Sequence, residues 1–386
     1  MNTRPPAFLR GAATTAFGRR EGCTAIDLMA EATFSAVHAA GLAMADIDGV
    51  LCGYATTMPH LMLSTVLCER LGLQPHYAHS LQLGGATGAA MVMLASELVR
   101  SGRCKHVLVT AGENRLTGQS RDSSINTLAQ VGDAEFEVPN GANVPAYYGL
   151  MASEYMHRTG TSEHDLAALA VLMRHNAITH PLSHLKPPLT EDDVLQSKPI
   201  ATPLKLADCC PISDGSVALV VSAQPGANHA VHIAGAGQAH LHQHLSAMHD
   251  VMDCGAGQAA RRAFTEAGVS PADIDYLGIY DSFTITLAML LEETGFAPRG
   301  QAGAKARAGD FRRDGPLPLN THGGLLSFGH CGVAGGMAHT AEAWLQMTGN
   351  AGSRQIRQPK HAFIHADGGV MSSHVSLVLS QYAKEA

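Results

Sequence analysis

The sequence predicts an α/β protein built from two similar halves, because two of its segments each occur twice in the same order. Residues 40–50 read AGLAMADIDGV and residues 267–277 read AGVSPADIDYL, with Ala, Gly, Ala, Asp, Ile and Asp at matching places. Residues 106–112 (HVLVTAG) are likewise similar to residues 361–367 (HAFIHAD). Two fused units of this kind bury a shared core and leave a cleft where they meet, which is the expected place for a site.

In the first half, short apolar runs predict strands and longer apolar runs predict helices. Residues 8–14 are the first predicted strand, and residues 25–40 form a helix that Gly41 ends at its C-cap. The run 88–101 is almost uncharged, so we expect a helix that is buried on all sides. The other expected elements are a strand at 49–52, a helix at 61–71, and strands at 106–111 and 214–221.

The second half repeats this order of elements. A strand at 231–234 opens it, and a helix at 258–267 leads into the second copy of the repeated segment. We then expect a strand at 276–280, a helix at 284–294, a buried helix at 335–348 after a Gly-rich turn, and strands at 362–365 and 375–380.

The stretch between about residues 112 and 201 has no regular pattern of this kind. It contains helical pieces and a Pro-rich segment at 180–188. We interpret it as an inserted cap or loop region. The predicted domains are therefore residues 1–223, which include the insertion, and residues 224–386.

Composition narrows the class of protein. Charged residues make up 15% of the 386, below the roughly 25% of an average globular protein, so much of the surface should be covered. A net charge of −7 without a basic run argues against nucleic-acid binding. No stretch approaches the 18 or so apolar residues of a membrane span. The eight cysteines form no C-x-x-C pair and no signal peptide is evident, so we expect a cytoplasmic protein with reduced thiols.

Three motifs together identify a family resemblance. Residues 210–218 read CPISDGSVA, residues 280–283 read YDSF, and residues 320–332 read NTHGGLLSFGHCG. In this combination the chain resembles the thiolase superfamily, in its sterol-carrier-protein-type branch, over essentially its whole length. The resemblance implies a thiolase fold of five αβαβα layers and a CoA thioester as substrate. It also implies at least a homodimer, formed by an edge strand and a helix near residues 80–110.

The chain departs from that family where the family has its nucleophile. Thiolases carry a cysteine in a motif like C-S-T-G at the start of the first buried helix, where free N–H groups and the helix dipole lower the thiol pKa. Here residues 84–88 read GGATG and the cysteine position falls on Gly85, which has no side chain to acylate. The second thiolase cysteine, of a C-x-G-G-G motif, is also missing, because residues 365–369 read HADGG. Backbone N–H groups near Gly85 and Gly369 could still form an oxyanion pocket.

The resemblance assigns candidate roles to several side chains. His330 falls on the histidine that polarises a thioester oxygen or activates the nucleophile, although a turn histidine could also cap backbone groups. Tyr280 and Asp281 end a buried strand at an acid or oxyanion position of the relatives. A phenol there would need a neighbour that lowers its pKa before it could serve as the base for a β-hydroxyl proton, a role that Tyr280 or Tyr147 could take. It can donate a hydrogen bond without a pKa shift, or simply pack its ring. Asn320 would join His330 in the oxyanion pocket.

Three further candidates could have either a catalytic role or an ordinary structural one. Tyr147 aligns near a thiolase active-site histidine, or packs beside its aromatic neighbour. His365 could form a polar pair with Asp367 at the cleft floor, or be a satisfied strand histidine. Cys331, beside His330, is a candidate relocated nucleophile, although a small buried cysteine is the commoner outcome.

The leading functional hypothesis is an enzyme that makes or breaks a carbon–carbon bond in an acyl-CoA thioester without a covalent acyl-enzyme, as thiolase-like aldolases do. Those aldolases work with a small OB-fold, zinc-ribbon partner, which this chain could share. The alternatives are an acetyl-CoA acetyltransferase that uses Cys331, or a non-catalytic scaffold that binds acyl-CoA or lipid for a partner. We expect no bound metal and no covalently bound cofactor.

Overall fold

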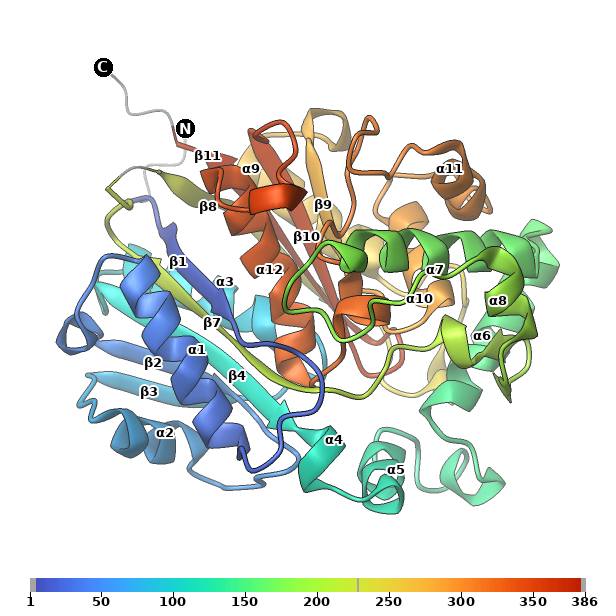
Figure 1. Ribbon diagram of the computed structural model, residues 1–386, viewed down its shortest axis with the longest axis horizontal. Helices are drawn as coiled ribbons and strands as arrows, with labels where there is room; N and C mark the ends of the chain where they lie inside the picture. Colours follow the sequence, from blue (N-terminus) through green and yellow to red (C-terminus); the bar gives the residue numbers. More distant parts are fainter. Residues whose placement is uncertain (1–4, 228, 383–386) are drawn as a thin grey trace.

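The computed structural model describes residues 5–227 and 229–382. Nine of its strands form one mixed sheet in the order β3-β2-β4-β7-β1-β8-β11-β10-β9, and β5 and β6 form a separate pair (Figure 1). The strands are β1 (Phe8–Thr14), β2 (Gly49–Gly53), β3 (Tyr77–Leu81), β4 (His106–Asn114), β5 (Pro199–Ala201), β6 (Leu204–Lys205), β7 (Asp214–Ser222), β8 (Val231–His240), β9 (Tyr276–Ile279), β10 (His361–Gly368) and β11 (Ser373–Gln381). The α-helices are α1 (Ala25–Ala39), α2 (Leu63–Leu71), α3 (Thr87–Arg100), α4 (Arg115–Gly118), α5 (Arg121–Ala129), α6 (Val144–Thr159), α7 (Glu163–Ile178), α8 (Glu191–Gln196), α9 (Ala256–Ala267), α10 (Thr284–Glu293), α11 (Ala302–Ala308) and α12 (Val333–Thr348).

The sheet consists of two similar groups of strands. The order β2-β4-β7-β1 in the first group is matched by β9-β10-β11-β8 in the second, and the groups meet where Phe8 of β1 pairs with His232 of β8. In the first group, β3 pairs with β2. At the matching position beside β9, the described part of the second group has one parallel bridge, between Leu277 and Leu319. The chain passes from one group to the other between Ser222 and Val231, a connection that contains the predicted boundary at 223/224.

The elements stack in five layers. Helices α3 and α12 pack against each other and against strands of both groups, so they form the central layer. Helix α1 covers β1, β4 and β7 on one outer side, and α9 covers β8 and β11 on the other. Figure 1 shows α12 running between the two groups of strands. This is the αβαβα arrangement that the sequence predicts.

Two predicted elements differ from the structure. Strand β8 continues to His240, six residues beyond the predicted end at 234. Its inner glycines permit this, since a Cβ on Gly235 or Gly237 would overlap the backbone of α9, which lies directly on the strand. Helix α3 is not buried on all sides, because Met93 and Leu94 are partly exposed.

The inserted region, interpreted from the sequence as a cap or loop region with helical pieces, is mainly helical. It holds α4 to α8, and α7 begins with a capping box in which the Ser162 hydroxyl and the Asp165 carboxylate exchange hydrogen bonds with backbone N–H groups. Helix α7 packs against α10 and α11, so the insertion lies over the second half. Among the described residues, no helix combines the length and the apolar character needed to cross a membrane.

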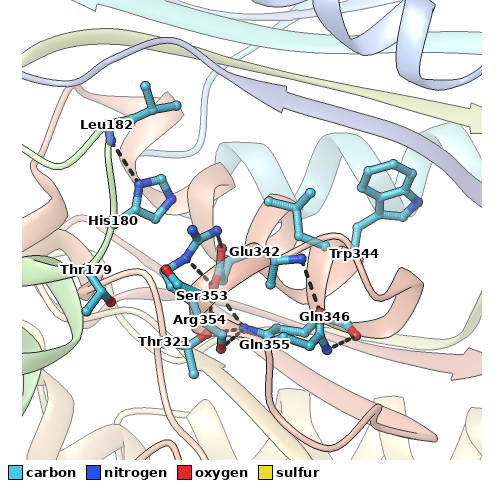
Figure 2. Close-up of polar contacts among 12 residues, drawn as sticks. Thr179, His180, Leu182, Thr321, Glu342, Trp344, Gln346, Ser353, Arg354 and Gln355 are labelled. Atoms are coloured by element: carbon cyan, nitrogen blue, oxygen red, sulfur yellow. Dashed lines mark hydrogen bonds and ion pairs between the residues drawn. The ribbon is translucent and has the colours of Figure 1, made fainter.

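A buried polar network holds α12 in the central layer (Figure 2). The Glu342 carboxylate on α12 accepts hydrogen bonds from Arg354 Nη2 at 2.8 Å, Arg354 Nε at 3.0 Å and Thr321 Oγ1 at 2.8 Å. Gln346, one turn further along α12, donates to Thr321 Oγ1 at 2.9 Å and to the Arg354 carbonyl at 2.9 Å. Because Thr321 follows Asn320 in the NTHGG motif, this network fixes the segment that leads into the cleft.

Candidate active site

A cavity of about 470 Å³ lies between the two halves. Both groups of strands and the insertion contribute to its wall. Its lining residues include Tyr54, Thr56, Gln82, Gly84, Gly85, Arg115, Val144, Tyr148, Ile200, Cys209, Cys210, Ile212, Tyr280, Phe283, His330, Gly332, Asp367 and Gly369. The predicted residues Gly85, Tyr280, His330 and Gly369 are therefore brought together, from four segments that are distant in sequence.

Gly85 stands at the N-terminus of α3, which begins at Thr87. A Cβ on Gly85 would overlap the Tyr280 hydroxyl oxygen and would lie 2.5 Å from the Asp367 carbonyl oxygen. A phenol thus fills the space that a nucleophilic side chain at position 85 would need. The structure accepts only glycine there without rearrangement.

Tyr280 and His330 form the first polar pair of the cavity. The Tyr280 hydroxyl oxygen lies 3.0 Å from His330 Nε2. Burial, together with the charge of Arg115, lowers the pKa of His330 to about 3, so the imidazole is neutral at neutral pH. Burial and the nearby Asp367 raise the pKa of Tyr280 well above its usual value, so the phenol keeps its proton. The neutral ring nitrogen can thus accept a hydrogen bond from the phenol, and this contact gives a direct path between them for a proton.

Tyr148 and Asp367 form the second polar pair. The Tyr148 hydroxyl donates to Asp367 Oδ2 at 3.1 Å, and its ring stacks on Phe283 with centroids 4.3 Å apart. Asp367 Oδ1 is buried and has no hydrogen-bond partner among the described residues. Burial raises the pKa of Asp367 well above its usual range, which favours the protonated form of this carboxyl group.

Two predicted residues, Asp281 and Asn320, stabilise backbone segments next to the cavity but do not line it. The Asp281 carboxylate accepts the backbone N–H of Leu325 at 2.7 Å and so holds the turn before His330. The Asn320 side chain bonds both backbone groups of Ile279, with Oδ1 accepting at 2.9 Å and Nδ2 donating at 2.8 Å. Neither residue is among those that line the cavity in the described part of the chain. The Asn320 amide thus fixes the end of β9 at Ile279, which directly precedes Tyr280.

The other three predicted residues also lie outside the wall formed by the described residues. The Tyr147 hydroxyl is buried without a hydrogen-bond partner there, next to Gly132, while its neighbour Tyr148 faces the cavity. His365 is buried on β10, with Nδ1 2.8 Å from Ser376 Oγ and Nε2 3.1 Å from His374 Nδ1. Cys331 is fully buried, and burial raises its thiol pKa well above the usual value, which disfavours a nucleophilic thiolate.

Two wall residues carry chemistry that the sequence did not single out as catalytic: Tyr148 and Arg115. Asp367 was predicted at the cleft floor as the partner of His365, but its hydrogen-bond partner is Tyr148. Tyr148 and Asp367 belong to segments that the motifs had marked, but only the fold shows which side chains face inward. Within residues 5–227 and 229–382, no group of three or more His, Cys, Asp or Glu side chains is placed to hold a metal ion.

A five-layer α/β fold with this cleft, the glycine turn before α3 and a G-H motif beside a tyrosine define a thiolase-type protein. The C-terminal part, residues 237–381, matches the family described as "Thiolase C-terminal domain-like". The chain is 30% identical over 370 residues to an acetyl-CoA acetyltransferase of Methanothermobacter thermautotrophicus, covering 93% of this chain and 95% of that protein. It belongs to the thiolase family, which confirms the resemblance seen in the sequence.

Two further relatives are lyases. One is the 17-hydroxy-3-oxo-4-pregnene-20-carboxyl-CoA lyase of Mycobacterium tuberculosis, 28% identical over 392 residues, covering 96% of this chain and 98% of that one. The other is a solved structure, the Ltp2-ChsH2(DUF35) aldolase, with a TM-score of 0.83 and 28% identity over 98% of both chains. The family branch thus contains both acyltransferases and carbon–carbon lyases.

Proposed function

We propose that this thiolase-family enzyme cleaves the carbon–carbon bond of a 3-hydroxyacyl-CoA by a retro-aldol reaction, without an acyl-enzyme. The observation that carries the proposal is the Tyr280 hydroxyl, which fills the space of a side chain at position 85. The site has lost its nucleophile, and a proton-transferring phenol occupies the vacated space. The lyase relatives support this choice over acyl transfer.

The two polar pairs divide the proton transfers between them. The 3-hydroxyl of the substrate gives its proton to the Tyr280 oxygen, while the Tyr280 proton moves to His330 Nε2, 3.0 Å away. The bond between C2 and C3 then breaks, leaving a carbonyl compound and the enolate of the shortened acyl-CoA. Tyr148, hydrogen-bonded to Asp367, gives a proton to C2 of this enolate. The extra proton on His330 then returns through solvent to the Tyr148 oxygen, so both side chains end in their starting protonation states. No electron is gained or lost overall, so no redox cofactor is needed.

The enolate oxygen needs donors that are already in place when charge develops. Gly85 and Gly369 line the cavity, and Gly85 lies at the N-terminus of α3, where the helix dipole favours negative charge. We assign the oxyanion pocket to the backbone N–H groups of these two glycines. Asn320 has no part in the oxyanion pocket, because its side-chain amide is hydrogen-bonded to the backbone of Ile279 in β9.

Partner, assembly and location are part of the same proposal. Because the similar aldolase structure is a Ltp2-ChsH2(DUF35) pair, we infer that this chain works with a small OB-fold, zinc-ribbon partner. We further propose a homodimer through the edge strand β3 and helix α3, on which Met93 and Leu94 are left partly exposed. All eight cysteines are free, which supports a cytoplasmic setting.

Intact-mass measurement after incubation with acetyl-CoA tests the absence of an acyl-enzyme. We expect no mass increase for the wild type or for Cys331→Ser. An acetyl adduct that is lost in Cys331→Ser would instead establish an acyltransferase with a relocated nucleophile, and the retro-aldol proposal would be abandoned.

Cleavage of a 3-hydroxyacyl-CoA, with and without a DUF35 partner, tests the chemistry itself. Removing either member of a proton-transferring pair typically costs about 10²- to 10⁴-fold in rate. We therefore expect Tyr280→Phe and His330→Gln to lose that much of kcat while CoA binding is retained. Unchanged turnover in both variants would favour a scaffold role.

A further inference from the structure

Arg115 carries a charge in the cavity wall that the proposed proton transfers do not use. It follows β4 in α4, lines the cavity, and is only 8% exposed. No hydrogen bond or ion pair joins its guanidinium to any of the described residues, and its buried Nε is without a partner. A buried guanidinium without a counter-ion is costly, so this site favours an anionic ligand.

The acids near Arg115 are committed elsewhere. Glu113, two residues earlier, accepts four hydrogen bonds from the backbone N–H and hydroxyl groups of Thr56 and Thr57, at 2.6 to 3.2 Å. Asp214 accepts backbone N–H groups, including that of Leu116 at 2.7 Å. Among the described residues, neither of these carboxylates forms an ion pair with the Arg115 guanidinium. The guanidinium is thus left for a group that enters the cavity.

The position of Arg115 indicates which part of the substrate that group belongs to. Arg115 lies close enough to His330 for its charge to lower the pKa of the ring, so it stands near the reacting atoms. The phosphates of CoA lie at the far end of the long pantetheine arm from the thioester. A permanent anion near His330 must therefore come from the acyl group.

We propose that Arg115 binds a carboxylate on the acyl part of the substrate, so that the enzyme selects CoA thioesters of dicarboxylic acids. A guanidinium presents its N–H groups in a plane that matches the two oxygens of a carboxylate. This inference rests on the proposed function, because it places an acyl-CoA in the same cavity. It adds the class of acyl group that the cavity accepts.

Binding of two isosteric CoA esters tests the assignment without requiring turnover. Succinyl-CoA ends in a carboxylate, and 4-methylpentanoyl-CoA ends in an uncharged isopropyl group of similar size and the same branching. Calorimetry should show tighter binding of succinyl-CoA to the wild type. Arg115→Gln should lose on the order of 100-fold of that affinity, as expected for one partner of a buried charge pair, and Arg115→Lys should keep part of it.

The other ester and free CoA serve as controls. Arg115→Gln should bind 4-methylpentanoyl-CoA and free CoA as the wild type does. Arg357→Gln, an exposed site on the loop before β10, should change none of the affinities. Thermal unfolding of each variant checks that it is folded.

Three results would overturn the assignment. Equal binding of the two esters by the wild type would remove the carboxylate preference. A matching loss of free CoA affinity in Arg115→Gln would reassign Arg115 to the phosphates. A loss of turnover that is equal for charged and uncharged substrates, with no change in binding, would make Arg115 an oxyanion ligand. Failure of every CoA compound to bind would instead overturn the proposed function together with this inference.

Discussion

Position 85 decides which chemistry the cavity can host, because its side-chain space is already taken. The Tyr280 hydroxyl and the Asp367 carbonyl both lie where a Cβ would stand. In this position the phenol oxygen of Tyr280 lies 3.0 Å from His330 Nε2. A side chain at position 85 and the hydroxyl of Tyr280 therefore exclude each other in this cavity.

A double-mutant cycle tests this coupling. Gly85→Ala should destabilise the protein by about 1–3 kcal/mol, the usual cost of overpacking a filled site. In a Tyr280→Ala background part of that cost should vanish, because the phenol is gone and only the Asp367 carbonyl still conflicts. Urea unfolding of the four proteins measures the coupling. Strict additivity would mean that the two residues do not compete for one space.

The protonation state of Asp367 gives a pH prediction. Because burial raises its folded-state pKa well above the ordinary value of about 4, the folded protein holds a proton that the unfolded chain releases. The stability due to this group is present below about pH 4 and is lost as pH rises toward the raised pKa. Asp367→Asn should thus be more stable than the wild type at pH 8, with the difference vanishing near pH 4.

Urea midpoints between pH 4 and pH 9 measure this difference. Asp367→Asn should also keep much of the activity, since an amide can still hold the Tyr148 hydroxyl, whereas Asp367→Ala should not. A wild type whose stability relative to Asp367→Asn rises with pH would show that the carboxyl group is ionised.

The motifs predicted Gly85, Tyr280, His330 and Gly369 at the cavity, because each belongs to a turn at the end of a strand or helix. They did not separate Tyr147 from Tyr148. Successive helical residues point about 100° apart, so only one of the two can face the cavity. Both are aromatic and both are buried, and the choice depends on how α6 packs. Arg115 was not predicted, because its lack of a hydrogen-bond or ion-pair partner among the described residues depends on the tertiary structure.

At the scale of elements, local patterns failed where packing overrides them. The inner glycines of β8 read as the end of a strand, yet they are what lets the strand continue beneath α9. The insertion showed no regular pattern, because its helix α7 packs against α10 and α11 of the second half and not against a strand that follows it in sequence. The repeated elements themselves were predicted well, because their alternation of strand and helix is a local signal.

The network around α12 gives a prediction at this scale. Burial opposes ionisation of Glu342, but the hydrogen bonds and charge of Arg354 lower its pKa to about 2. The stability from this carboxylate is present above its ordinary pKa of about 4.3 and is lost as pH falls toward 2. Glu342→Gln leaves Arg354 buried without its counter-ion, which should cost about 3–5 kcal/mol at pH 7.

Unfolding midpoints from pH 7 down to pH 3 check both parts of this prediction. The gap between Glu342→Gln and the wild type should narrow below about pH 4. Glu69→Gln, an exposed change on α2, should alter neither the midpoint nor its pH dependence. A constant gap across the range would mean that Glu342 is already protonated in the folded protein.

At the scale of the whole molecule, the cavity exists only because two similar halves face each other. Gly85 and Arg115 come from the first half and its insertion, whereas Tyr280, His330 and Asp367 come from the second. Duplication gave both halves a buried central helix, α3 and α12, and the site uses the N-terminal ends of that layer. Neither half alone brings the two polar pairs together.

The two halves differ at one edge, and this difference leads to the proposed dimer. In the first group β3 is an unpaired edge strand, whereas the second group has only a single bridge at the matching place. An unpaired edge readily adds another strand, and in a two-fold dimer residue 79 would face its own copy. His79 is exposed on β3.

His79→Glu should therefore place two like charges together and convert the dimer to monomers, while His79→Gln should leave it intact. Light scattering across a concentration series measures the mass of each. A wild type that is monomeric at every concentration would contradict the β3 interface, and a His79→Glu dimer would move that interface to another surface.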